Sequence, residues 1–168
     1  MAAADTTVKE PPSLALPGLG HALVAAGQLN QRTAEDIYRK AQLSRSNFIS
    51  ELIESGSVSA SALAHTMSSA FAAPLVDLDA VDVNRLPKGL LDSKICIAYR
   101  VVVLSKRGNR LIVATADPSD QSAAEKIKFA TQLGVDWIIA EFDKLSRMVE
   151  QSTTSAADAV DNIIGSDF

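Results

Sequence analysis

Few residues of this sequence could carry out catalysis, and their surroundings do not favour it. The two histidines, His21 and His65, have no carboxylate or cysteine at the spacing of a metal site, so they are expected to be satisfied or surface residues. Cys96, the single cysteine, lies between two isoleucines, which favours a buried structural thiol over a nucleophile. These patterns predict no catalytic residue and no metal site.

Aspartates in two connecting segments are the remaining candidates for chemistry. Asp77, Asp79 and Asp82 occur without the glycine-turned loop of a calcium site, which indicates solvated turn residues. Asp117-Pro118 follows an expected strand and has two interpretations, the mouth of an α/β site or an ordinary strand-to-helix turn. The turn is the favoured interpretation, and the site stays open as the alternative.

Nucleotide-binding motifs are absent from the sequence. It contains no G-x-x-x-x-G-K-[ST] phosphate loop, and Gly18-Leu19-Gly20 does not follow a strand, as a dinucleotide-binding fingerprint would. We therefore do not expect this chain to hydrolyse ATP.

Composition narrows the class of protein further. The chain of 168 residues has a net charge of −4, and its 16 Lys and Arg are spread thinly, which argues against nucleic acid as a partner. No apolar run approaches the ~18 residues of a membrane span, and the first residues lack the form of a signal peptide. A cytoplasmic protein without membrane insertion is expected.

A helix–turn–helix pattern is repeated between Leu19 and Phe71, with a shift of 29 positions. Each copy has an apolar stripe, a glycine where a helix should end, a small polar cap and a second apolar stripe. The matched positions are Gly27 with Gly56 and Asn30 with Ser59. Because so small a unit must pack on its twin, the repeat predicts four short helices.

The pattern changes after Pro74, where strand signals appear. A hairpin is expected from strands 99–104 and 111–116, and Ile127 and Phe129 are the expected apolar anchors of a following helix. The other expected elements are an extended segment or edge strand over 75–78, a helix from Asn84 through Leu91, the anchored helix over 122–132, a third strand over 135–140 and a last helix from 143 to about 151.

Together these elements predict an α+β fold. A bundle of about four short helices packs with a small α/β unit of about three strands and two to three helices. The expected division is a flexible leader over 1–17, the repeat over 18–72, the α/β unit over 73–151 and a flexible linker over 152–168.

Most of residues 19–151 resembles the N-terminal domain of secretion and pilus assembly ATPases, the GspE-like type II secretion and PilB-like type IV pilus families. The motifs that carry the resemblance are Leu19-Gly20-x-x-Leu23-x-x-x-Gly27, its weaker echo ending at Gly56, Pro74-Leu75-Val76-Asp77-Leu78, Leu86-Pro87, Val101–Leu104, Leu111-Ile112-Val113-Ala114-x-Ala116-Asp117-Pro118 and Phe129-x-x-x-x-Gly134. Of these families, the pilus type is the more similar.

This resemblance implies a regulatory module rather than a motor. In such ATPases a downstream hexameric core carries the phosphate loop, so ATP and Mg²⁺ are expected only in that core, outside this chain. The domain is also similar to the MshEN module, whose tandem motifs bind cyclic di-GMP in some members and open with Arg-Leu-Gly. If cyclic di-GMP binds here, the resemblance assigns it to Leu19, Gly20, Leu23 and Gly27.

The sequence departs from that module where its arginines should be. Gly18 and Asn47 occupy the arginine positions of the two copies, and Ile49 replaces the second motif glycine. The resemblance then implies docking of a PilZ-type adaptor, with the protein held at the inner-membrane pilus machinery through its partners. Direct binding of cyclic di-GMP and a purely structural role in the hexamer are the alternatives. The partner-contact candidates on the repeat are Ile37, Tyr38, Phe48 and Phe71.

Overall fold

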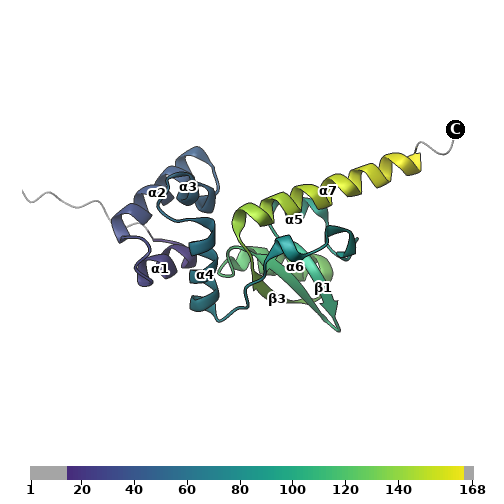
Figure 1. Ribbon diagram of the computed structural model, residues 1–168, viewed down its shortest axis with the longest axis horizontal. Coiled ribbons are helices and arrows are strands. Elements are labelled where there is room, and N and C mark those ends of the chain that lie inside the picture. The colour runs from purple at the N-terminus through teal and green to yellow at the C-terminus, as the bar shows by residue number, and fades with distance from the viewer. Residues whose placement is uncertain (1–14, 165–168) are drawn as a thin grey trace, which may run out of the picture.

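In the computed structural model of the protein, the backbone is described for residues 15–164 and the side chains for residues 15–154. Figure 1 shows a block of helices beside a unit that contains a small sheet. The expected flexible leader therefore lies mostly outside the described residues. Its last part does not, because Leu16 is buried in the core.

The helical block consists of the four helices that the repeat predicted. They are α1 (Gly18–Ala25), α2 (Gln31–Ser44), α3 (Phe48–Glu54) and α4 (Ala60–Phe71). Asn30 caps α2 by accepting a hydrogen bond from the Thr33 amide, and Ser59 caps α4 by accepting one from the Ala62 amide. Gly27 and Gly56 have φ angles of 73° and 72°, so both helix-ending glycines adopt the left-handed conformation that the pattern predicted.

The α/β unit contains one three-stranded sheet with the order β1-β2-β3. Its strands are β1 (Val102–Arg107), β2 (Arg110–Thr115) and β3 (Gly134–Ile139), and its helices are α5 (Ser93–Tyr99), α6 (Gln121–Thr131) and α7 (Phe142–Ile164), with short 3₁₀ turns at η1 (Leu78–Ala80) and η2 (Val83–Arg85). β1 and β2 form the predicted antiparallel hairpin, and β3 pairs parallel to β2. The α+β prediction is confirmed. The expected edge strand at 75–78 is reduced to a single bridge between Leu75 and Ile139.

Between residues 84 and 104 one helix prediction was wrong and one helix was missed. The expected helix from Asn84 to Leu91 is only the turn η2, because Leu86 precedes a proline and is extended, with ψ at 144°. A helix that the sequence had not indicated, α5, begins instead after its cap Asp92. It runs to Tyr99, which delays the start of the first strand to Val102.

The ends and faces of the later helices also differ from expectation. Phe129 is 78% exposed while Ile127 is fully buried, because residues two apart on a helix point to different faces. α7 continues to Ile164 instead of ending near Gln151. Segment 152–164 has the composition of a linker, but it is also rich in alanine, the strongest helix former.

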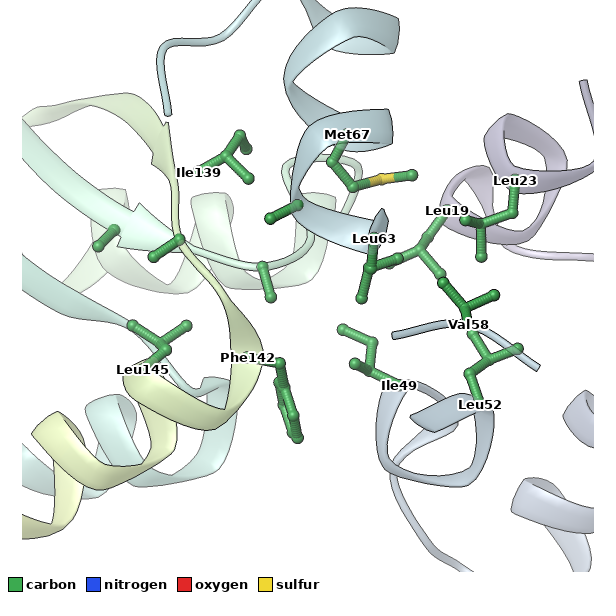
Figure 2. Packing of buried hydrophobic residues seen from close by; sticks show 14 of the residues in the cluster. Leu19, Leu23, Ile49, Leu52, Val58, Leu63, Met67, Ile139, Phe142 and Leu145 are labelled. Carbon is green, nitrogen blue, oxygen red and sulfur yellow. The ribbon is translucent and has the colours of Figure 1, made fainter. Parts of the chain in front are cut away.

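The two halves share one hydrophobic core, as Figure 2 shows. Leu19, Leu52 and Leu63 of the helical block belong to the same cluster as Phe142 and Leu145 of α7. On the other face of the sheet, a smaller cluster is formed by Val101, Val103, Leu111, Val113 and Ile127. Because the first cluster is continuous, the two halves pack directly against each other. None of the described helices combines the length and hydrophobicity that a membrane span requires.

Candidate functional site between the helical block and the α/β unit

A cavity of about 450 Å³ lies where the two halves meet. The starts of α1, α3 and α6 all contribute to its wall. The amide groups at a helix start carry positive partial charge, so the three helix starts add some positive potential to this wall. The lining residues are Pro17, Gly18, Tyr38, Asn47, Phe48, Ile49, Tyr99, Arg100, Thr115, Ala116, Asp117, Ser119, Asp120, Gln121, Ser122 and Phe142.

Gly18, at the first arginine position, is packed closely against the turn between β2 and α6. A Cβ atom placed on Gly18 would lie 2.8 Å from the Cβ of Ser119 and 3.0 Å from its Oγ. Such a contact is too short for any side chain unless the backbone moves. Ser119 therefore occupies the space that the Cβ atom of any side chain at position 18 would need.

Asn47, at the second arginine position, is used to start a helix. Its Oδ1 accepts hydrogen bonds from the amides of Ile49, at 2.9 Å, and Ser50, at 3.3 Å. The side chain thereby satisfies two of the amides at the start of α3. Its acceptor is turned to its own backbone and is not available to a ligand.

Arg100 supplies the only cationic side chain among the lining residues. It ends α5 in the left-handed conformation, with φ at 52°, and its guanidinium lies 5.9 Å from the ring centroid of Phe142. At that distance the guanidinium is attracted to the face of the ring. Among the described residues no carboxylate forms an ion pair with it.

Asp117 is a half-buried carboxylate of the wall. Its carboxylate accepts hydrogen bonds from the amide and the hydroxyl of Ser119. Burial raises the pKa of Asp117 above its ordinary value, although these bonds oppose the change. Asp120 caps α6 by accepting from the Ala123 amide at 3.1 Å. Asp117-Pro118 is therefore an ordinary strand-to-helix turn and also part of a cavity wall.

The ionisable side chains of the wall favour neutral or positive ligands. Two carboxylates, Asp117 and Asp120, stand against one guanidinium, Arg100. The helix starts offset part of this negative charge. The wall thus lacks the paired cations that a dianionic nucleotide would need.

The residues assigned to nucleotide binding have mainly packing roles. Leu19 and Leu23 are fully buried in the core. Gly20 faces Leu16, whose Cβ would lie 3.3 Å from an added Cβ, and Gly27 borders open space. Of this set, none lines the cavity.

The partner-contact candidates occupy different surroundings. Ile37 is buried, whereas Tyr38 and Phe48 are half-buried and line the cavity, with ring centroids 5.2 Å apart in an edge-to-face contact. Phe71 is 40% exposed at the end of α4. Sequence reasoning missed Arg100, because the helix that ends there had not been anticipated.

The other sequence candidates have structural roles. His21 and His65 are exposed, and His65 Nδ1 lies 2.8 Å from the carbonyl oxygen of Ser61. Within the described part of the chain, no group of three potential ligands could hold a metal ion. Cys96 is half-buried beside a second cavity of about 170 Å³.

The aspartates at 77 and 79 are more than solvated turn residues. The Nζ of Lys144 lies 3.0 Å from Asp77, 3.1 Å from Asp79 and 3.1 Å from Glu141. These three carboxylates raise the pKa of Lys144. The cluster ties η1 to the start of α7, and it brings together residues 67 positions apart.

The chain is similar in sequence to a known domain family and to known pilus ATPases. Residues 71–159 match the model of the MshEN domain, so the matched segment is the α/β unit with the end of α4. The PilB type IV pilus assembly ATPase of Pseudomonas aeruginosa is 32% identical over 148 residues, which are 88% of this chain and 26% of that protein. PilB of Acinetobacter baylyi is 33% identical over 129 residues, 77% of this chain and 22% of that protein. The chain spans about a quarter of the length of these curated relatives.

Solved structures share the fold over about four fifths of the chain. The structure of MshE with cdg (cyclic di-GMP) has a TM-score of 0.59 and 23% identity, and the match covers 80% of this chain and 97% of that one. The N-terminal domain of XpsE has a TM-score of 0.63 and 23% identity, with 79% and 91% covered. Together with the family match, these findings show that the chain belongs to the MshEN domain family and is a regulatory domain rather than a catalytic ATPase core.

Proposed function

We propose that this chain is the regulatory domain of a type IV pilus assembly ATPase and that it docks a PilZ-type adaptor coupled to cyclic di-GMP signalling. One observation carries the proposal: the residues at the two arginine positions of the tandem motif have structural roles. Gly18 packs closely against Ser119, and Asn47 caps α3. Without these arginines the motif is poorly suited to bind cyclic di-GMP directly, but an adaptor protein can still transmit the cyclic di-GMP signal by binding to the domain.

Charge supports this preference. A hydrogen bond to a charged group contributes about 1.5–3 kcal/mol, and bidentate arginine contacts are the stronger kind. Two missing arginines therefore reduce the affinity for a dianionic nucleotide by roughly two to four orders of magnitude. Arg100 replaces at most one of them, and Asp117 and Asp120 lie on the same wall.

The proposed contact surface uses the accessible members of the candidate set. Phe71 and the half-buried rings of Tyr38 and Phe48 offer apolar area to a partner, whereas Ile37 belongs to the core against which Tyr38 and Phe48 pack. Aromatic side chains of this kind contribute strongly to protein interfaces. In the cell, the proposed arrangement places the domain in the cytoplasm, joined to the remaining ATPase domains and held at the pilus machinery by its partners.

Direct binding of cyclic di-GMP is the second candidate function. MshE was solved with this ligand, and the cavity here offers three helix starts, Arg100 and several aromatic rings. A structural role, in which the repeat positions the domain within a hexamer, is the remaining alternative.

A pair of titrations separates these functions. Cyclic di-GMP and a purified PilZ-type adaptor are each titrated calorimetrically into the chain. We expect heat from the adaptor only, and we expect Phe71→Ser to weaken it while Arg100→Ala does not. Micromolar nucleotide binding that Arg100→Ala abolishes would instead establish direct binding. No binding heat in either titration would support the structural role.

A further inference from the structure

The two ends of the sheet carry opposite charge. β2 and β3 run parallel from the pair Arg110 and Gly134 to the pair Thr115 and Ile139. The tip of the β1–β2 hairpin therefore lies at one end of the sheet, and the connection from β3 to α7 lies at the other. Six strand residues separate the ends by about 20 Å.

The hairpin tip is basic and incompletely neutralised. Lys106, Arg107 and Arg110 are all exposed, and Arg107 lies directly opposite Arg110 in the strand register. Like charges in directly opposite positions destabilise a sheet. Asp136 relieves Arg110 at 2.7 Å, but no carboxylate of the described residues pairs with Lys106 or Arg107. The fold therefore leaves two cations free for an external acidic surface.

The opposite end has an excess of carboxylates. Asp77, Asp79 and Glu141 surround Lys144, and Arg147 lies 4.0 Å from Asp79. Asp143, in the first turn of α7, adds an exposed carboxylate. Arg100 over Phe142 adds a third cation at this end, and Asp117 and Asp120 add two more carboxylates, so negative groups remain in excess.

We propose that the hairpin tip of one copy docks on the acidic end of a second copy of this chain. Charge complementarity selects this occupant, because every copy presents both surfaces on opposite ends of one rigid sheet. The resulting contact is head to tail. It uses different surfaces on the two partners, so repeated contacts form either a growing chain of copies or a closed ring. Exposed ion pairs are weak and screened by salt, so the association is detectable at high protein concentration and low ionic strength.

Sedimentation velocity of the purified chain tests the proposal. At low salt the weight-average sedimentation coefficient should rise with protein concentration and pass beyond the dimer, and added salt should reverse the rise. Lys106→Glu with Arg107→Glu should abolish the association. A matched control, Arg32→Glu with Arg39→Glu on α2, makes the same change in net charge away from both ends of the sheet and should leave association intact.

A complementation experiment fixes the identity of the occupant. Asp79→Lys with Asp143→Lys reverses the acidic end, and this variant should associate with the hairpin-reversed variant although neither associates alone. Circular dichroism checks folding; if the loss of Asp79 unfolds the domain, Asp143→Lys alone, which reduces the negative charge of this end, should weaken the self-association of the chain.

Three results would overturn the proposal. They are a sedimentation coefficient independent of concentration at low salt, an association that stops at a dimer, and an association that survives hairpin reversal. Binding of the monomeric wild-type chain to anionic lipid vesicles, lost on hairpin reversal, would assign the tip to a membrane surface instead.

Discussion

Gly18 and Ser119 are in direct contact across the boundary between the helical block and the α/β unit, and a Cβ on Gly18 would be 2.8 Å from the Cβ of Ser119. The contact joins the first residue of α1 to the turn before α6. Gly18 stands at the position where the related motif has an arginine. The absence of a side chain at position 18 thus allows the start of α1 to lie close to the turn before α6.

Gly18→Ala is expected to destabilise the chain. The added methyl group must displace Ser119, and overpacking of this kind costs about 1–3 kcal/mol. Urea unfolding followed by Trp137 fluorescence measures the loss. In a Ser119→Gly background the cost should largely disappear, whereas in a Ser119→Ala background it should remain, because only the glycine removes the Cβ. Equal costs in both backgrounds would show that the contact is not the cause.

The two helix-ending glycines make a second prediction. At Gly27 and Gly56, which have positive φ angles and no atom within 4 Å of an added Cβ, alanine should cost about 1–2 kcal/mol each through backbone strain alone. Asparagine tolerates this conformation better and should cost less at both positions. Chemical denaturation of the four single variants gives the comparison. Similar losses for alanine and asparagine would point to a different cause.

Asp117 should make stability depend on pH in the acid range. Its pKa is raised in the folded chain, so the folded state holds the proton more tightly than the unfolded state does. Its contribution therefore favours folding at low pH and is lost as pH rises through the folded pKa. Asp117→Asn cannot titrate, and the difference in unfolding free energy between it and the wild type should change in that window. A difference that stays constant from acid to neutral pH would contradict the assigned shift.

Cys96 should react slowly with alkylating reagents. Burial raises the pKa of its thiol to about 11. Since the thiolate is the nucleophile, only about a hundredth of the ordinary thiolate population exists near pH 8. Iodoacetamide labelling followed by mass spectrometry should accelerate up to about pH 11 in the folded chain. In urea it should be fast already near pH 9, and equal rates in both states would show that the thiol is not protected.

Local signals in the sequence determined much of the helical block. A left-handed glycine and a polar cap act on a few neighbouring residues, so Gly27, Asn30 and their counterparts in the second copy could be identified without tertiary contacts. The hairpin was predictable for the same reason, since two runs rich in β-branched residues flank a polar turn. By contrast, α5 went unnoticed because Ile95-Cys96-Ile97 is compatible with either a strand or a helix.

The sequence also determined the absence of the arginines, because Gly18 and Asn47 can be read directly from the repeat. Tertiary structure alone decided what those positions do instead. Ser119 is 101 residues from Gly18, and Arg100 enters the cavity wall only because α5 ends there in a left-handed turn. Contacts between such distant residues depend on how the two halves pack, and that packing is set by the shared core as a whole. Local patterns therefore fixed the pieces, while the cavity arose from their assembly.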